Sequence, residues 1–154
     1  MTKPGQLYWS LVEPHWERIS IYDGGATFLR QFLTTPVRSR HLFAAHWCMS
    51  EVYNGGFHQF FCNSTGVLAP EAAAAFEAIG LVRLSDVVRE ATAFFPAPYP
   101  RDRGRRQELL DDYAHGRNAD DWNPFYMLDD QFVTLCITEL GGFEAAADKF
   151  AAEF

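Results

Sequence analysis

The sequence predicts an all-α fold, a compact bundle of about seven to nine helices that forms a single domain over residues 1–154. Apolar residues recur at spacings of three and four, and glycines and prolines separate the segments. Alternating patterns long enough for strands are hard to find. The chain is 48% hydrophobic, so it can bury a core without help from a metal or a disulfide.

The first two helices are defined by the glycines and prolines that end them. A helix is predicted over residues 8–22, with Pro14 either bending it or marking its true start. Asp23-Gly24-Gly25 ends this helix, as glycine beyond a helix end commonly does. A short helix follows over residues 26–33 and is ended by Thr35-Pro36.

The third helix, over residues 37–53, is the best defined, and we expect it to be central and heavily buried. Its apolar stripe consists of Leu42, Ala45, Met49, Val52 and Tyr53. Gly55-Gly56 then permits a sharp turn, because only glycine takes positive φ without steric cost. A further short helix follows, with one face formed by Phe57, Phe60, Phe61 and Ser64 and the opposite face by Gln59 and Asn63.

The second half of the chain is predicted to contain the remaining helices and one irregular loop. Residues 69–79 form a helix with Pro70 in its first turn and Gly80 just past its end. The next helix has Ser85 as its N-cap, and three prolines make the segment after it an irregular loop. The predicted ranges are 85–94 for that helix, 95–106 for the loop, 107–114 for a helix, 116–123 for a polar connector, 124 or 125 to 140 for a long helix, and 143–154 for the last helix.

Charge is distributed unevenly along the chain, whose net charge is −7. Residues 1–106 carry 11 Lys and Arg against 9 Asp and Glu, a balance of +2. Residues 107–154 carry 2 against 11, a balance of −9. An acidic surface repels nucleic acid and membrane surfaces and attracts basic partners. We therefore expect no direct contact with nucleic acid or membrane.

Three pairs of aspartates recur in the acidic half: Asp111-Asp112, Asp120-Asp121 and Asp129-Asp130. Carboxylates on one exposed side could offer arginines acceptors comparable with the phosphates of DNA. Other interpretations stay open at this point. The acids could be ordinary solvated surface, or Asp120 or Asp121 could cap a helix. The proline-rich loop also contains four arginines that could neutralise these aspartates: Arg101, Arg103, Arg105 and Arg106.

The turn after the third helix brings four polar side chains towards one corner: Glu51, Asn54, Gln59 and Asn63. The structural interpretation is that they hydrogen-bond each other and the helix ends, because buried polar groups need partners. The functional interpretation is a small pocket lined by amides, which a small enzyme or a ligand-binding protein could use. We favour the structural interpretation.

The same run resembles the signature of a known family, Glu-x-x-Asn-Gly-Gly-Phe-x-Gln-Phe-Phe-x-Asn-Ser-x-Gly, over about 16 residues. The matching positions are Glu51, Asn54, Gly55, Gly56, Phe57, Gln59, Phe60, Phe61, Asn63, Ser64 and Gly66. The family is the bacterial DNA-mimic-protein family, and weaker similarity extends over about residues 30–135. The resemblance implies an all-helical fold. In one branch it also implies an acidic homodimer that imitates the DNA backbone and occupies a transcription factor.

Signs of catalysis are few. His58 and Cys62 lie four residues apart, but a zinc site normally needs three or four ligands and a cysteine nucleophile needs an oriented base. Motifs for nucleotide binding, serine hydrolysis and zinc hydrolysis are absent from the sequence. We therefore expect neither a metal site nor a cofactor. The three scattered cysteines and the N-terminal sequence favour a cytoplasmic protein.

These observations predict a non-catalytic binding protein whose acidic half engages a basic protein, such as a DNA-binding regulator. Two alternatives remain open from the sequence. One is a small enzyme or ligand-binding protein that uses the polar corner. The other is a protein that neutralises a toxin, which composition does not distinguish from the first hypothesis.

Overall fold

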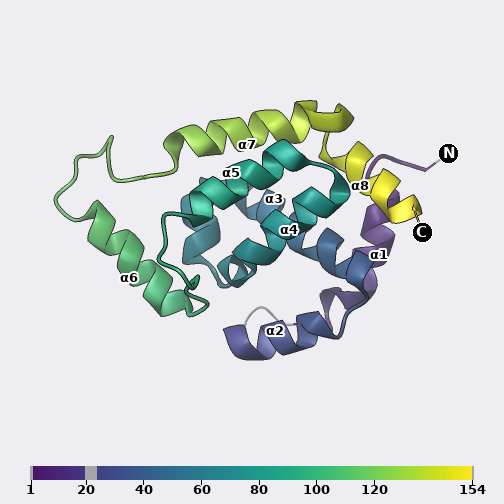
Figure 1. Ribbon diagram of the computed structural model, residues 1–154, viewed down its shortest axis with the longest axis horizontal. Coiled ribbons are helices and arrows are strands. Elements are labelled where there is room, and N and C mark those ends of the chain that lie inside the picture. The colour runs from purple at the N-terminus through teal and green to yellow at the C-terminus, as the bar shows by residue number, and fades with distance from the viewer. Residues whose placement is uncertain (1, 20–23, 154) are drawn as a thin grey trace.

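The computed structural model describes residues 2–19 and 24–153 (Figure 1). Within these ranges the chain forms eight α-helices, two short 3-10 helices and no strand. The elements in order are α1 (Gln6–Trp16), α2 (Gly25–Leu33), α3 (Val37–Cys62), η1 (Ser64–Leu68), α4 (Ala69–Ile79), α5 (Val82–Thr92), α6 (Arg103–Ala114), α7 (Tyr126–Thr138), η2 (Glu139–Gly141) and α8 (Phe143–Ala152). The all-α fold predicted from the sequence is confirmed.

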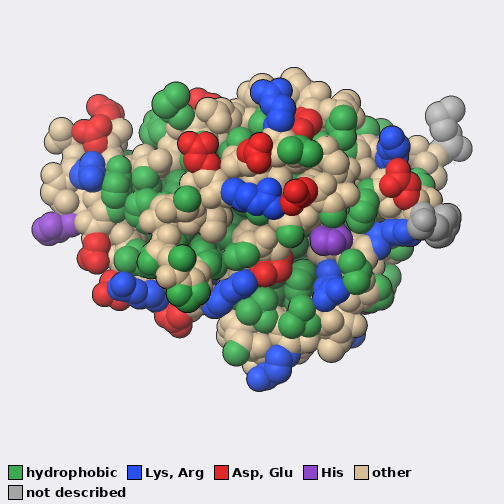
Figure 2. All heavy atoms as spheres, viewed as in Figure 1, with side chains coloured by type: hydrophobic (Ala, Val, Ile, Leu, Met, Phe, Trp, Pro, Cys, Tyr) green, Lys and Arg blue, Asp and Glu red, His purple; other side chains and the backbone are tan. Residues whose placement is uncertain are grey.

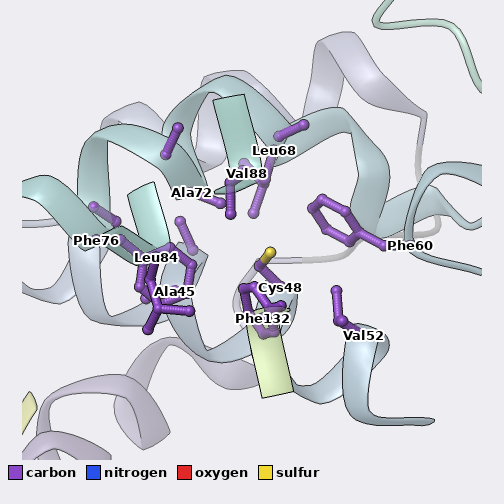
Figure 3. Close-up of a cluster of buried hydrophobic side chains, with 14 of the residues drawn as sticks. Ala45, Cys48, Val52, Phe60, Leu68, Ala72, Phe76, Leu84, Val88 and Phe132 are labelled. Atoms are coloured by element: carbon purple, nitrogen blue, oxygen red, sulfur yellow. The ribbon is translucent and has the colours of Figure 1, made fainter. Parts of the chain in front are cut away.

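Helix α3 lies at the centre of the fold. It packs most closely on α4, which packs in turn on α5, and α1, α6 and α7 also contact α3. Figure 1 shows α1 and α8 together at one end, beside both termini, and α6 at the opposite end. The core between these helices is shown in Figure 3 and includes Ala45, Cys48, Val52, Phe60, Leu68, Ala72, Phe76, Leu84, Val88 and Phe132. Burial of each large side chain contributes about 1.5–3 kcal/mol.

Some helix boundaries agree with the sequence prediction and others do not. Helix α4 has the predicted bounds, and Gly80 follows it in the left-handed conformation. Helix α1 begins at Gln6 and ends at Trp16, with Pro14 inside it rather than at its start. The last part of the predicted first helix, residues 20–22, lies outside the described residues. The 3-10 helix η1 was not predicted.

The predicted start of α5 at Ser85 is wrong. Helix α5 begins at Val82, and Ser85 is buried inside it, where its hydroxyl donates to the carbonyl of Ala73 at 2.8 Å. Serine can bond the backbone of a packed neighbour as readily as it caps a helix, and the sequence does not distinguish these uses. Ser85 therefore fastens α5 to α4.

The irregular loop is also shorter than predicted, because α6 begins at Arg103 and not at Gln107. Asp102 is the N-cap, and its carboxylate accepts from the amide of Arg105 at 2.8 Å. Aspartate before an arginine-rich turn is a favourable helix start, since arginine has high helix propensity. The long helix in the acidic half, α7, ends at Thr138 rather than at 140.

Three helical segments have no capping side chain at their own N-terminus, and a carboxylate from the acidic half of the chain caps each of them instead. Asp148 accepts from the amides of Gly5 at 2.7 Å and Tyr8 at 3.1 Å, at the start of α1. Glu139 does the same at the start of α5, with the amides of Arg83 at 2.9 Å and Leu84 at 3.0 Å.

In the third case, Asp129 accepts from the amide of Phe57 at 2.8 Å, where α3 resumes after its internal turn. Carboxylates at helix N-termini satisfy free amides and complement the helix dipole. Part of the acidity of residues 107–154 therefore stabilises the fold.

None of the helices in residues 2–19 and 24–153 is long and apolar enough to cross a membrane.

Candidate functional site

The glycine pair interrupts α3, as the sequence predicts. Gly55 has φ −157° and ψ 20°, and Gly56 has φ 76° and ψ 180°, a conformation that is essentially restricted to glycine. A Cβ on Gly55 would lie 2.0 Å from Gln59 Oε1, and a Cβ on Gly56 would lie 2.6 Å from Asp129 Oδ2. Both glycines are therefore needed, because polar side chains cover the turn on two sides.

A polar cluster closes the turn. Glu51 Oε2 accepts from Gln59 Nε2 at 2.8 Å and from Asn63 Nδ2 at 3.0 Å. These two bonds join the helical segments before and after the glycines. Of the four polar side chains expected at one corner, the structure thus links three by hydrogen bonds. The fourth, Asn54, is exposed and lines the same hollow.

The remaining residues of the motif are packed into the fold. Phe57, Phe60 and Phe61 are fully buried. Ser64 is half-buried. Gly66 is buried, and its carbonyl accepts from the Tyr99 hydroxyl at 2.6 Å. A Cβ on Gly66 would lie 2.6 Å from the carbonyl oxygen of Phe60, so this glycine is required by close approach of the backbone.

Arg106 completes this network, although the sequence indicated it only as one of four arginines that could neutralise the aspartates. Its side chain is fully buried, and it donates to the carbonyls of Phe61 at 2.9 Å and Asn63 at 2.9 Å. It also donates to the carbonyls of Pro100 and Arg101, so four bonds hold the guanidinium. Burial lowers the pKa of Arg106 from its ordinary value. The only sequence signal was its place in an arginine-rich segment, which usually indicates surface.

An open hollow of about 630 Å³ borders the polar cluster. It is lined by Trp47, Ser50, Glu51, Tyr53, Asn54, Gln59 and Asn63. The indole nitrogen of Trp47 is buried and has no hydrogen-bond partner among the described residues. The corner is therefore partly occupied by side chains that hydrogen-bond to one another, and it is partly open to solvent.

The aspartate pairs lie on α6, the connector after it and α7. Asp111, Asp112, Asp120, Asp121 and Asp130 are exposed. Asp129 differs, because it is half-buried and caps the second segment of α3. Burial raises the pKa of Asp129, while hydrogen bonds from the Phe57 amide and the Asn123 side chain act in the opposite direction. Five of the six carboxylates thus face solvent.

The arginines of the proline-rich segment bind elsewhere in the fold. Arg101 pairs with Glu71, Arg105 pairs with Glu108 at 3.3 Å, and Arg103 donates to the carbonyl of Cys62 at 2.7 Å. Within residues 2–19 and 24–153, the remaining ion pair joins Arg89 and Glu77. The five exposed aspartates therefore have no ion-pair partner in the described part of the chain.

Figure 2 shows acidic side chains at the end of the molecule formed by α6 and the connector, with some basic side chains among them. More acidic side chains lie over α5 and α7. There, Asp86 and Glu90 of α5 and Asp130 of α7 line an open groove of about 440 Å³. The sequence prediction missed Asp86 and Glu90, although their four-residue spacing on a helix places them on one face.

The cysteine and the histidine that lie four residues apart on α3 are within hydrogen-bond distance of each other. Cys62 Sγ lies 3.6 Å from His58 Nδ1. Burial and the nearby charge of Asp111 raise the pKa of the Cys62 thiol, whereas a nucleophilic cysteine needs a lowered pKa. Burial lowers the pKa of His58, and Asp111 and Asp129 act in the opposite direction. In the described ranges, no three His, Cys, Asp or Glu side chains converge as a metal site requires.

Comparison with known proteins gives one family match. The family model for DMP19-like protein matches residues 34–152, from the loop before α3 to the end of α8. No curated protein matches the chain, and no solved structure does. The matched region contains the glycine turn, the polar cluster around Glu51 and all three aspartate pairs. Because the match covers most of its length, the chain belongs to the DMP19-like protein family.

Proposed function

We propose that this protein is a DNA mimic, which occupies the DNA-binding surface of a basic protein such as a transcription regulator. The contact surface comprises the exposed carboxylates of α6, the connector and α7, namely Asp111, Asp112, Asp120, Asp121 and Asp130. The observation that carries the proposal is that these five side chains have no ion-pair partner of their own in the described residues. Membership of the DMP19-like family supports the same role.

The chemistry of such a contact follows from what DNA-binding proteins recognise. They bind closely spaced negative charges with Arg and Lys, and arginine forms paired hydrogen bonds with carboxylate as it does with phosphate. A carboxylate already paired inside its own chain would have to break that pair first. The free carboxylates around α6 avoid that cost.

Displacement of DNA from purified regulators tests the proposal. Labelled operator DNA bound to each regulator is titrated with this protein, and its release is followed by fluorescence anisotropy. The acidic-pair variant replaces Asp111, Asp112, Asp120 and Asp121 by Asn. The opposite-end variant removes the same number of exposed charges on α1 and α8 and at the residues that follow these helices, by replacing Glu13, Glu17, Glu144 and Glu153 by Gln.

We expect the acidic-pair variant to displace DNA roughly a hundredfold less effectively, at about 1 kcal/mol or less for each lost charge pair. The opposite-end variant should displace DNA nearly as well as the wild type. Equal potency of the acidic-pair variant and the wild type would refute the proposal. Equal loss in both variants would show that only net charge matters.

The finer features of the role follow from the same proposal. A cytoplasmic location suits a regulator as partner and suits three free cysteines. A homodimer, implied by the resemblance to the dimeric branch, would present two acidic surfaces to a dimeric regulator. Binding to a toxin with a basic surface, in place of a regulator, would use the same carboxylates. Displacement of operator DNA distinguishes these two kinds of partner, because a regulator binds operator DNA and a toxin does not.

A second candidate function is ligand binding at the hollow beside Glu51. The unpartnered indole nitrogen of Trp47 and the open polar lining favour it. Screening small carboxylates and amides for an increase in melting temperature would test this function, with the Trp47→Phe variant as control. A ligand that stabilises both proteins equally would not bind at this hollow.

A further inference from the structure

Three large apolar side chains are exposed between the second and third aspartate pairs. Trp122 is 38% exposed, Tyr126 is 64% exposed and Met127 is 76% exposed. Met127 is the most exposed large apolar side chain in the described part of the chain. Single exposed apolar residues are common on protein surfaces, but here three lie within six residues along the chain, with aspartates before and after them. We call these three side chains the apolar anchor.

Packing of their neighbours fixes the segment that carries the anchor. Phe125 is 1% exposed, and its ring lies 5.1 Å from that of Phe61 and 5.4 Å from that of Phe94. Its amide donates to Asn123 Oδ1 at 2.9 Å. The ring of Trp122 contacts His58 edge-on at 4.8 Å. Because Phe125 is held in the core, Tyr126 and Met127 remain on the outside at the start of α7.

The composition of this region is that of a protein–protein interface. Interfaces commonly have aromatic and methionine side chains at the centre and charged side chains at the rim. Here Asp120, Asp121 and Asp130 lie close along the chain on either side of the anchor, exposed and without an ion-pair partner in the described residues. The DNA backbone has no counterpart to the apolar anchor, so imitation of phosphate charge alone does not explain it.

We propose that the apolar anchor binds the apolar face of a cationic amphipathic helix in the partner. The lysines and arginines along the edges of that helix pair with the surrounding aspartates. Charge complementarity selects this occupant, because a neutral apolar helix would leave the aspartates beside it desolvated and unpaired. The proposal rests on the proposed function for the acidic surface and adds a component of binding that salt does not screen.

Two synthetic peptides test the proposal with the full-length protein. Both have about 18 residues, five turns of helix, and the same number of lysines on one face. The other face carries leucine in the first peptide and alanine in the second, so the two differ in apolar area and not in charge. Dissociation constants are measured by titration calorimetry at low and high salt.

We expect the leucine peptide to bind at least about tenfold more tightly than the alanine peptide, with much of that difference kept at high salt. The Tyr126→Ser/Met127→Ser variant should lose the difference. The control is the Ile137→Ser/Leu140→Ser variant. Ile137 lies near the other end of α7 and Leu140 just beyond it, and their side chains are 65% and 61% exposed. This control should bind both peptides as the wild type does.

The other outcomes overturn one proposal or the other. Equal affinity for both peptides, or no binding of either, would overturn the anchor. The same loss in the Ile137/Leu140 variant would place the apolar contact elsewhere and also overturn it. If the acidic-pair variant kept full affinity for both peptides, the pairing of lysines with the surrounding aspartates would be overturned together with the acidic surface, and only the apolar contact would stand.

Discussion

At the scale of single residues, the motif of residues 51–66 provides a turn within α3 and holds it. Gly55 gives room for Gln59, Gly56 gives room for Asp129, and Glu51 joins the two helical segments through Gln59 and Asn63. Most of the motif residues thus have partners within the fold, whereas the exposed aspartates of α6 and the connector have no ion-pair partner in the described residues.

Replacing Gly56 by Ala should lower the free energy of unfolding by about 3 kcal/mol. About 1–3 kcal/mol comes from the backbone conformation and about 1 kcal/mol from displacement of the Asp129 cap. Gly116→Ala is the matched control, because Gly116 also has φ 76° but nothing lies within 4 Å of a Cβ there. Urea unfolding followed by circular dichroism measures both. A larger loss in Gly116→Ala would contradict this account of the turn.

At the scale of helices, distant carboxylates decide where several of them begin. The start of α5 is set by Glu139, which lies 55 residues from Leu84 along the chain. The start of α1 is set in the same way by Asp148. The Asp148 cap joins the two ends of the sequence, and the Glu139 cap joins α5 to the segment after α7. Both caps therefore stabilise the tertiary fold together with the individual helices.

Removal of the distant cap should weaken the fold measurably. Glu139→Ala leaves the amides of Arg83 and Leu84 without their acceptor, and we expect a loss of about 1–2 kcal/mol in chemical denaturation. Glu139→Gln keeps an acceptor oxygen and should recover part of that loss. Glu90→Ala, an exposed acid on α5, should change stability by less than about 0.5 kcal/mol. Equal effects at Glu139 and Glu90 would show that the cap contributes nothing.

The same long-range contacts explain which features the sequence could predict. Helix α4 was predicted with its bounds because its signals, Pro70 and Gly80, are local. The start of α5 was not predicted correctly, because the carboxylate that caps it belongs to Glu139, 55 residues from Leu84 along the chain. The polar corner was predicted from helical spacing, but the capping role of Asp129 depends on α7 lying beside the glycine turn. Likewise, the internal pairing of the arginines depends on tertiary contacts that composition does not specify.

At the scale of the whole molecule, the N-terminal helix is joined to the core through aromatic rings around a half-buried histidine, His46. His46 lies among Tyr8, Trp9, Trp16 and Trp47, and Trp16 stacks on Trp47 with ring centroids 4.7 Å apart. The Tyr8 hydroxyl is 3.2 Å from His46 Nδ1. Burial lowers the pKa of His46 from 6.5 to about 4.

This histidine should make the protein sensitive to acid. The unfolded chain takes up a proton near pH 6.5, whereas the folded protein resists protonation of His46 until about pH 4. The stability that neutral His46 contributes is therefore complete above pH 6.5 and is lost as pH falls towards 4, by about 3 kcal/mol in all. Unfolding free energies measured between these pH values should show this slope, and His46→Phe should reduce it. The control is His115→Phe, which replaces an exposed histidine. A slope that is the same in His46→Phe as in the wild type would contradict the claim that His46 causes the acid sensitivity.

The central claim is that the carboxylates of α6 and the connector are free to pair with cations of a partner. The most direct test is the dependence on salt of the affinity for the regulator that this protein displaces from DNA. We expect affinity to fall steeply between about 50 and 200 mM salt. The slope should be clearly shallower in the acidic-pair variant and unchanged in the opposite-end variant. The same slope in all three proteins would contradict the claim.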